Sequence, residues 1–364
     1  MNKTYFTGKI NSYIYFLLLV FFYSSCSKDP VETPLPEEPD IVEPAEKTFT
    51  NPLIPRGADP WVTQKDGIYY YTYTQGSKLV LYVTKNLVEL KDVKPINIFV
   101  PPPGTMYSQN IWAPEIHEIN GNWYMYFAAD NGSNANHRMY VIENTSGSPL
   151  RGSWELKEKI TVPNDEWAID GTVMTYNDQL YFLWSGSNRG AAPQHIYIAK
   201  MSNPWTIEGE RVRLSTPEYE WEKYGQGNVV TNGINEGPQA LFNPQGKLFV
   251  VYSASSFLSD SYALGLLSLK DNGDPMNPAD WTKTPTPVFT MNAESGAYGV
   301  GHNGFFKSPD GTEDWIIYHA RNLPDNGSTN YRNPRMQKFT WNKDGTPNFG
   351  KPVKIGEKIE VPSG

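Results

Sequence analysis

One pattern occurs five times along the chain: a polar residue leads a short extended run, a turn rich in Gly, Asn or Asp follows, and an aromatic-rich run comes next. The leading residues, at intervals of 55 to 66 residues, are Asp59, Glu115, Asp170, Glu236 and His302. A unit of this length can hold one four-stranded propeller blade with its connections. A β-sandwich is also rich in strands, but it would not repeat one hairpin five times. We therefore expect an all-β, five-bladed β-propeller.

The composition agrees with many short strands. Trp, Tyr and Phe make up 14% of the 364 residues, and there are 30 Gly and 30 Pro. Aromatic residues favour strands, whereas Gly and Pro mark turns, so a helical bundle or a doubly wound α/β fold is disfavoured. A net charge of −8 argues against a nucleic-acid partner. A single Cys excludes a disulfide framework and a Cys-based zinc site.

The first residues of the chain predict a targeting signal rather than part of a folded domain. Lys3 and Lys9 precede an apolar run of eleven residues, 13–23, which suits a signal peptide and is too short for a membrane span. Cys26 follows at once, and the arrangement resembles a bacterial lipoprotein signal. The alternative is an ordinary secretory signal with an incidental Cys.

We accordingly expect three parts: a signal peptide over residues 1–25, a lipidated Cys26 with an acidic, Pro-rich, disordered tether over 26–47, and the propeller over 48–364. This organisation predicts an envelope lipoprotein, in the outer membrane, whose contact with the membrane is through the lipid alone. We expect the protein to be a monomer.

The five leading residues point to a site on the propeller axis. The first strand of each blade lines the central channel, so equivalent residues converge there. Buried acids are costly unless they are paired, hydrated or used in chemistry. Four carboxylates without a nucleophile motif indicate either cation binding or glycoside hydrolysis. In the latter, one carboxyl protonates the leaving oxygen and another activates water. Aromatic rings that flank the repeats are candidates for stacking on sugar, or for packing between blades: Trp61, Trp112 and Trp184.

Three of these motifs resemble the catalytic carboxylates of glycoside hydrolase family 43: Asp59 in Ala-Asp-Pro, Asp170 in Ile-Asp-Gly and Glu236 in Asn-Glu-Gly-Pro. The runs Trp112–Glu115 and Gly301–Asn303 are similar to that family's second-blade and fifth-blade motifs, and the likeness extends over residues 51–340. It implies an inverting enzyme that acts on furanosides or xylosides of plant polysaccharides. It further implies that Asp59 is the general base, Glu236 the general acid, and Asp170 the group that tunes and orients the acid.

The same resemblance suggests further roles. His302 corresponds to an axial His near a calcium or sodium ion that is bound through waters, and no cofactor is needed for the chemistry. Of two late arginines, Arg332 and Arg335, we choose Arg335 as the sugar contact because Met336-Gln337 follows it. Glu115 is left between sugar binding and holding a neighbouring blade.

Other motifs carry less weight. Residues 299–304 match G-x-G-x-x-G, but no helix is expected after them, and no G-x-S-x-G elbow occurs. The predicted function is an exo-acting α-L-arabinofuranosidase, with a β-xylosidase or an arabinanase of the same family as alternatives. A non-catalytic, surface glycan-binding propeller is the alternative of another class. Three inserts, 97–110, 186–194 and 215–233, are candidates for closing one end of the channel.

Overall fold

The computed structural model describes residues 47–325 and 331–364. The expected signal peptide, Cys26 and all but the last residue of the expected tether lie outside the described residues. Within the described part, no helix combines the length and apolar character that crossing a membrane requires.

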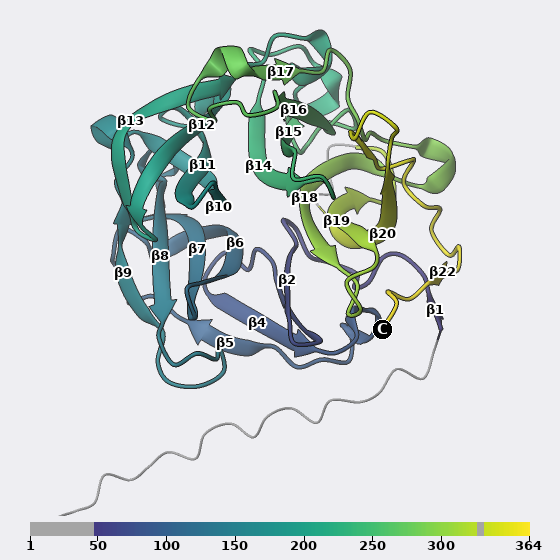
Figure 1. The fold of residues 1–364 in the computed structure, drawn as a ribbon, viewed down its shortest axis with the longest axis horizontal. Coiled ribbons are helices and arrows are strands. Elements are labelled where there is room, and N and C mark those ends of the chain that lie inside the picture. Colours follow the sequence, from purple (N-terminus) through teal and green to yellow (C-terminus); the bar gives the residue numbers. More distant parts are fainter. Residues whose placement is uncertain (1–46, 326–330) are drawn as a thin grey trace, which may run out of the picture. The chain divides into compact units, whose positions relative to one another are not determined.

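Five antiparallel four-stranded sheets surround a central axis in the described part of the chain, and each comes from one continuous segment (Figure 1). The expected five-bladed propeller is therefore confirmed. The strands are β2(Trp61–Lys65), β3(Ile68–Thr72), β4(Leu79–Thr84) and β5(Ile96–Phe99) in blade one; β6(Gln109–Ile119), β7(Asn122–Asp130), β8(Arg138–Asn144) and β9(Glu155–Ile160) in blade two; β10(Trp167–Tyr176), β11(Gln179–Asn188), β12(Ala191–Asn203) and β13(Thr206–Ser215) in blade three; β14(Asn235–Phe242), β15(Leu248–Ala254), β16(Ala263–Leu269) and β17(Trp281–Lys283) in blade four; and β18(Tyr298–Lys307), β19(Asp314–Arg321), β20(Asn333–Trp341) and β21(Pro347–Asn348) in blade five.

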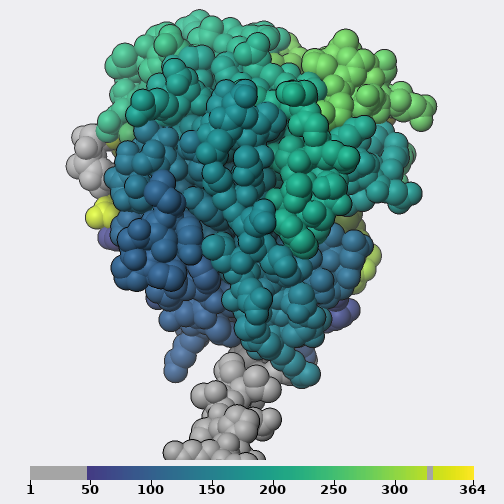
Figure 2. Space-filling view, turned by 90° about the vertical axis from the view of Figure 1, so that its left-hand side faces the viewer, coloured from purple at the N-terminus to yellow at the C-terminus, as the bar shows by residue number. Residues whose placement is uncertain are grey.

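The helices of the described part are single 3₁₀ turns in the connections. They are η1(Leu87–Glu89), η2(Asn134–Asn136), η3(Pro163–Asp165), η4(Glu220–Glu222), η5(Gln226–Asn228), η6(Pro278–Asp280) and η7(Ala293–Ser295). Of these, η4 and η5 lie in the segment that joins blade three to blade four. Figure 2 shows the molecule from the side, with residues of the second and third blades, coloured blue to teal, on much of the face toward the viewer.

The aromatic residues pack mainly between blades. Each of five hydrophobic clusters in the described residues joins two neighbouring sheets, which accounts for much of the aromatic content. Trp184 belongs to the cluster between blades two and three, is fully buried, and stacks between Phe182 and Tyr197. The expectation that Trp184 contacts sugar is therefore wrong: its place on β11 turns the ring into the interface rather than toward the axis.

The ring closes through the two ends of the described domain. The strand β1(Thr48–Phe49) pairs with β22(Ile359–Glu360), and the two lie side by side in Figure 1. Asn51 then forms two hydrogen bonds with the backbone of Met336 in blade five, each of 3.0 Å. Blade five is thereby joined to the start of blade one without a shared sheet.

Candidate active site

One equivalent point recurs in the five blades, within the inner strand in blades two to five and just before it in blade one. A residue with positive φ stands there: Asp59 at 56°, Ala113 at 44°, Asp170 at 54°, Gly237 at 54° and His302 at 49°. In blades two to five the pairing with the next strand shifts register at this point. Such bulges re-aim side chains and are common beside active sites, and positive φ is unusual for residues other than Gly.

This register corrects the alignment of the second and fourth repeats; in the fourth, Gly237 and not Glu236 is the equivalent of Asp59. Ala113, not Glu115, is the structural equivalent of Asp59, so Glu115 lies two residues further along its strand. Its buried carboxylate accepts a hydrogen bond from Gln239 of blade four and lies 3.0 Å from Nε2 of His117. Glu115 does not line the pocket described next, and its contacts are those of a residue that holds two blades together.

One pocket of about 190 Å³ collects most of the predicted residues. Its volume is below the ~300–1,000 Å³ typical of sites for drug-sized ligands, which suits a single sugar ring. The pocket is lined by Asp59, Thr74, Trp112, Ile169, Asp170, Glu236, Phe257, His302 and Arg332. The three predicted carboxylates, Trp112 and His302 thus come together from five different blades or their connections.

Asp59 is held as a carboxylate. Its Oδ1 lies 2.7 Å from Nη1 of Arg332, and its Oδ2 accepts a 2.7 Å hydrogen bond from Oγ1 of Thr74. Its backbone N–H donates to Nδ1 of His319 at 3.2 Å. Burial acts to raise the pKa of Asp59, but Arg332, with His302 and His319, outweighs burial and holds this pKa well below its ordinary value. Asp59 is therefore ionised over the neutral range and accepts protons.

Asp170 and Glu236 form a pair of carboxyl groups whose pKa values are raised, whereas that of Asp59 is lowered. Burial, followed by the charge of Glu236, raises the pKa of Asp170 well above its ordinary value. Burial is also the main cause that raises the pKa of Glu236 to about 7, against a hydrogen bond from Tyr262 that lowers it. Two buried carboxyl groups that repel each other retain one proton between them near neutral pH.

The hydrogen bonds of the pair decide which group carries that proton. Oδ2 of Asp170 accepts from the backbone N–H of Gly237 at 3.0 Å. A backbone N–H can only donate, so it favours the ionised form of Asp170. Glu236 meets the hydroxyl of Tyr262 at 2.8 Å, and a hydroxyl tolerates either protonation state. These hydrogen bonds favour Glu236 over Asp170 as the group that carries the shared proton, while burial raises the pKa of both.

The arginine of the pocket is not the expected one. Arg335 lies within β20, is fully buried, and donates to Asn333, to the side chain of Asn322 and to the backbone oxygen of Gly296. The expectation that Arg335 contacts sugar is wrong because its side chain points into blade five. Arg332 precedes β20, lines the pocket, and packs over the ring of Phe257 at 4.3 Å.

Two tryptophans that flank the axis behave differently. Trp112 lines the pocket and stacks on His137, with ring centroids 4.0 Å apart. Trp61 does not line the pocket: its Nε1 donates to the backbone oxygen of Ile116 at 2.8 Å, and its ring packs against His117. Trp61 therefore joins blades one and two.

The sequence reasoning did not single out three lining residues: Ile169, which lies within a repeated hairpin, and Thr74 and Phe257. Thr74 and Phe257 lie outside the repeated hairpin, in connections that no motif marks. Thr74 also accepts a 2.7 Å hydrogen bond from the backbone N–H of Ala113, so it ties blade two to Asp59.

The donor set around His302 does not form a coordination shell by itself. Nδ1 of His302 lies 3.5 Å from Oδ1 of Asp59. In the described part of the chain, no group of three His, Cys, Asp or Glu side chains is arranged to hold a metal ion. No step of the chemistry below is routed through an ion.

Comparison with known proteins places these features in a family. The family described as Glycosyl hydrolases family 43 matches residues 49–347. An "Extracellular exo-alpha-(1->5)-L-arabinofuranosidase" from Streptomyces avermitilis is 39% identical over 336 residues, which cover 90% of this chain and 67% of that protein. One of the same name from Streptomyces chartreusis is 36% identical over 76% of this chain and 84% of its own length. The crystal structure of an alpha-L-arabinofuranosidase from Lactobacillus brevis superposes with a TM-score of 0.77 at 38% identity, covering 85% of this chain and 98% of that one.

Proposed function

The chain belongs to glycosyl hydrolases family 43, and we propose that it is an inverting, exo-acting α-L-arabinofuranosidase that releases α-L-arabinofuranosyl residues from plant cell-wall polysaccharides or oligosaccharides. The observation that carries the proposal is the pocket of one-sugar size in which an ionised Asp59 stands with a protonated Glu236. The relatives named arabinofuranosidases, at 36% to 39% identity, support the choice of sugar.

The charges assign the steps. Asp59 takes a proton from a water molecule as that water attacks the anomeric carbon. Glu236 gives its proton to the glycosidic oxygen as the bond from that oxygen to the anomeric carbon breaks. Attack and departure on opposite faces invert the anomeric configuration. Asp170 stays ionised, and its negative charge opposes ionisation of Glu236 and thereby keeps Glu236 protonated.

A panel of substrates tests the sugar. We expect turnover of aryl α-L-arabinofuranosides and release of arabinose from linear arabinan or arabinoxylan, with little turnover of aryl β-xylosides. Proton NMR should show the β-anomer of arabinose first. Faster cleavage of the xyloside would reassign the enzyme as a β-xylosidase, internal cleavage of arabinan would make it an arabinanase, and a retained first product would remove the mechanism.

The alternative of a non-catalytic glycan-binding propeller is tested at Asp59. An Asp59→Ala variant should lose turnover by about 10²–10⁴-fold, because general base catalysis is worth that much. Its binding of arabino-oligosaccharides, measured by calorimetry, should persist. Equal activity of the variant and the parent would contradict the assignment of the base.

We also propose that the enzyme is held at the cell envelope through Cys26. The apolar run over residues 13–23 and the Cys that closely follows it support this proposal. A Cys26→Ser variant should move from the membrane fraction to the soluble fraction with unchanged activity on aryl glycosides. Retention of the variant in the membrane fraction would contradict lipid anchoring.

A further inference from the structure

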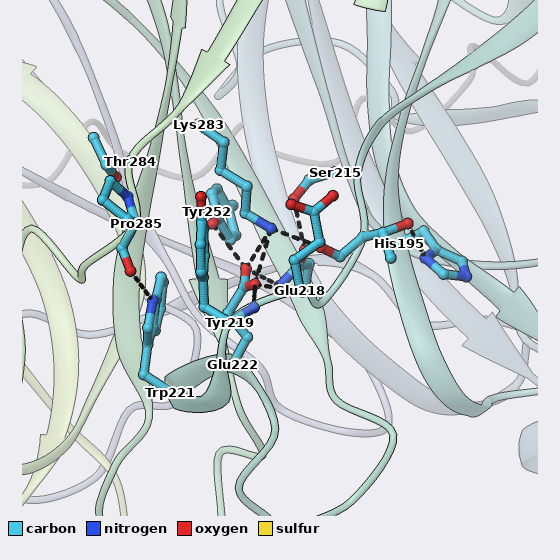
Figure 3. Close-up of polar contacts among 12 residues, drawn as sticks. His195, Ser215, Glu218, Tyr219, Trp221, Glu222, Tyr252, Lys283, Thr284 and Pro285 are labelled. Carbon is cyan, nitrogen blue, oxygen red and sulfur yellow. Dashed lines mark hydrogen bonds and ion pairs between the residues drawn. The ribbon is translucent and has the colours of Figure 1, made fainter.

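The connection between blades three and four folds around one buried carboxylate (Figure 3). Glu222, at the end of η4, is fully buried. Its Oε1 lies within 3.0 Å of Nδ2 of Asn235, the hydroxyl of Tyr252 and Nζ of Lys283. Its Oε2 accepts from Nζ of Lys283 and from two backbone N–H groups, those of Glu218 and Tyr219.

A buried ion pair of this kind is a poor device for stability alone. Removing Glu222 and Lys283 from water is costly, and well-packed apolar residues of similar volume often stabilise a fold as much or more. The Glu222 carboxylate instead fixes the orientation of the connection relative to blade four. It joins the connection to the starts or bodies of three strands of blade four: β14, β15 and β17.

The strand that matters for chemistry is β14. Asn235 is its first residue and directly precedes Glu236. The side chain of Asn235 is held at both ends, by Oε1 of Glu222 at 3.0 Å and by Oγ of Ser215 at 2.6 Å. Its backbone oxygen accepts from Oγ of Ser185 at 2.9 Å. The residue before the acid is therefore fixed from three sides, and Glu222 supplies the charged contact.

The same connection also contacts the segment that leads to another lining residue, Phe257. The backbone N–H of Tyr224 donates to Oγ of Ser255, and the backbone oxygen of Tyr224 accepts from Ser256 at 2.7 Å. Phe257, over which Arg332 packs, directly follows these residues. The fold of this connection thus reaches both the acid and the arginine that contacts the base.

We propose that Glu222 is a positioning residue for the general acid: its buried carboxylate holds Asn235 and thereby aims Glu236 at the glycosidic oxygen. The proposal rests on the function proposed above. It concerns a residue that lines no part of the pocket and that acts through Asn235.

Leaving groups separate this role from a structural one. A misplaced general acid slows the cleavage of substrates whose leaving group needs protonation. It has little effect on substrates whose leaving group does not, such as nitrophenyl glycosides. For Glu222→Gln we expect kcat to fall at least tenfold more on oligosaccharides and methoxyphenyl arabinofuranoside than on nitrophenyl arabinofuranoside, within the 10²–10⁴-fold that general acid catalysis supplies. KM should change little.

Glu143→Gln is the matched control. Glu143 is also a buried carboxylate with a Tyr hydroxyl at 2.6 Å, Tyr124, and a Lys ammonium at 3.0 Å, Lys157, but it lies in blade two and lines no part of the pocket. Per folded molecule, measured by circular dichroism, Glu143→Gln should slow all substrates equally or not at all.

A second variant protects the test against misfolding. Glu222→Gln with Lys283→Met removes both charges and so avoids an unpaired buried ion. The double variant should show the same dependence on the leaving group. An equal fall on all substrates, or no fall, in either folded variant would overturn the positioning role. Failure of the unmodified enzyme to cleave any arabinofuranoside would instead overturn the proposed function.

Discussion

At the scale of single residues, one pocket pushes the pKa values of its carboxyl groups in opposite directions. Burial raises the pKa of all three, yet Asp59 ends well below its ordinary value whereas Asp170 and Glu236 end above theirs. The main difference is one cation: Arg332 contacts Asp59 directly, whereas the direct hydrogen bonds to Asp170 and Glu236 come from neutral donors. Base and acid are therefore chosen by their neighbours rather than by residue type.

The first prediction concerns pH. Glu236 must be protonated to act and its pKa lies near 7, so kcat/KM should fall as pH rises through 7. Asp59 must be ionised and its pKa lies well below 3.8, so no loss from Asp59 is expected down to about pH 4. A Glu236→Gln variant, assayed on nitrophenyl arabinofuranoside, should lose the alkaline fall. Persistence of that fall in the variant would show that another group causes it.

A second residue-scale prediction separates the two arginines. Without the guanidinium, Arg332→Met should raise the pKa of Asp59, so the acidic limb of kcat/KM should move to higher pH and the rate should fall at neutral pH. Arg335→Met should lower stability because several buried acceptors lose their donor, but the folded enzyme should keep its acidic limb. Equal shifts in both variants would argue against a specific role for Arg332.

These residues also show what the sequence could and could not predict about the site. Asp59, Asp170, Glu236 and His302 each stand in a repeated unit, so repetition alone brings them to one axis. Arg332 and Arg335 are three positions apart, and only the start of β20 at Asn333 decides which one faces the pocket. Sequence pattern does not set a strand boundary to within three residues.

At the scale of elements, a bulge interrupts the inner strands of blades two to five, and the pocket residues Asp170, Glu236 and His302 lie at these bulges. Asp170 and His302 adopt left-handed backbone conformations there, and Asp59 adopts the same conformation two residues before β2 begins. The repeated hairpins were predictable from their turns and aromatic runs. The position of the bulge was not predictable. In blade two it falls on the apolar residue Ala113, whereas the polar residue taken as the start of that repeat, Glu115, lies two positions later.

Gly237 gives the element-scale prediction. Its φ is +54°, a Cβ there would lie 3.3 Å from Nδ1 of His302, and its N–H holds Asp170. Gly237→Ala should cost at least the ~1–2 kcal/mol of left-handed backbone strain and also lower kcat. Gly246→Ala is the control, since its φ is +81° but a Cβ would meet nothing within 4 Å. Urea unfolding should show a similar backbone cost in both, with loss of kcat in Gly237→Ala alone. Full activity in that variant would contradict the part given to this amide.

At the scale of the whole molecule, the five carboxyl and histidine positions keep their spacing only if the ring stays closed. The closing contacts include two residues of β1 with two of β22, the pair of hydrogen bonds between Asn51 and Met336, and the backbone bonds from Leu53 to Pro334 and from Gly57 to Arg332. Strands of two residues have no periodicity, so this closure could not be predicted from the sequence, although the number of blades could.

The last prediction concerns one of these closing contacts. Asn51 is 2% exposed, and both of its bonds reach backbone groups of Met336, which is itself fully buried. Asn51→Ala would leave a buried N–H and a buried C=O without partners, which should lower the free energy of unfolding by about 1–3 kcal/mol for each group left unsatisfied. Asn342→Ala, which removes an exposed side-chain bond to Thr346, should change it by less than ~0.5 kcal/mol. Because Asn51 touches no lining residue, kcat per folded molecule should be retained in both variants. A midpoint of urea unfolding that is equal in Asn51→Ala and in the parent would mean that the ring is closed by interblade packing, and that the two strands and the Asn51 bonds merely accompany it.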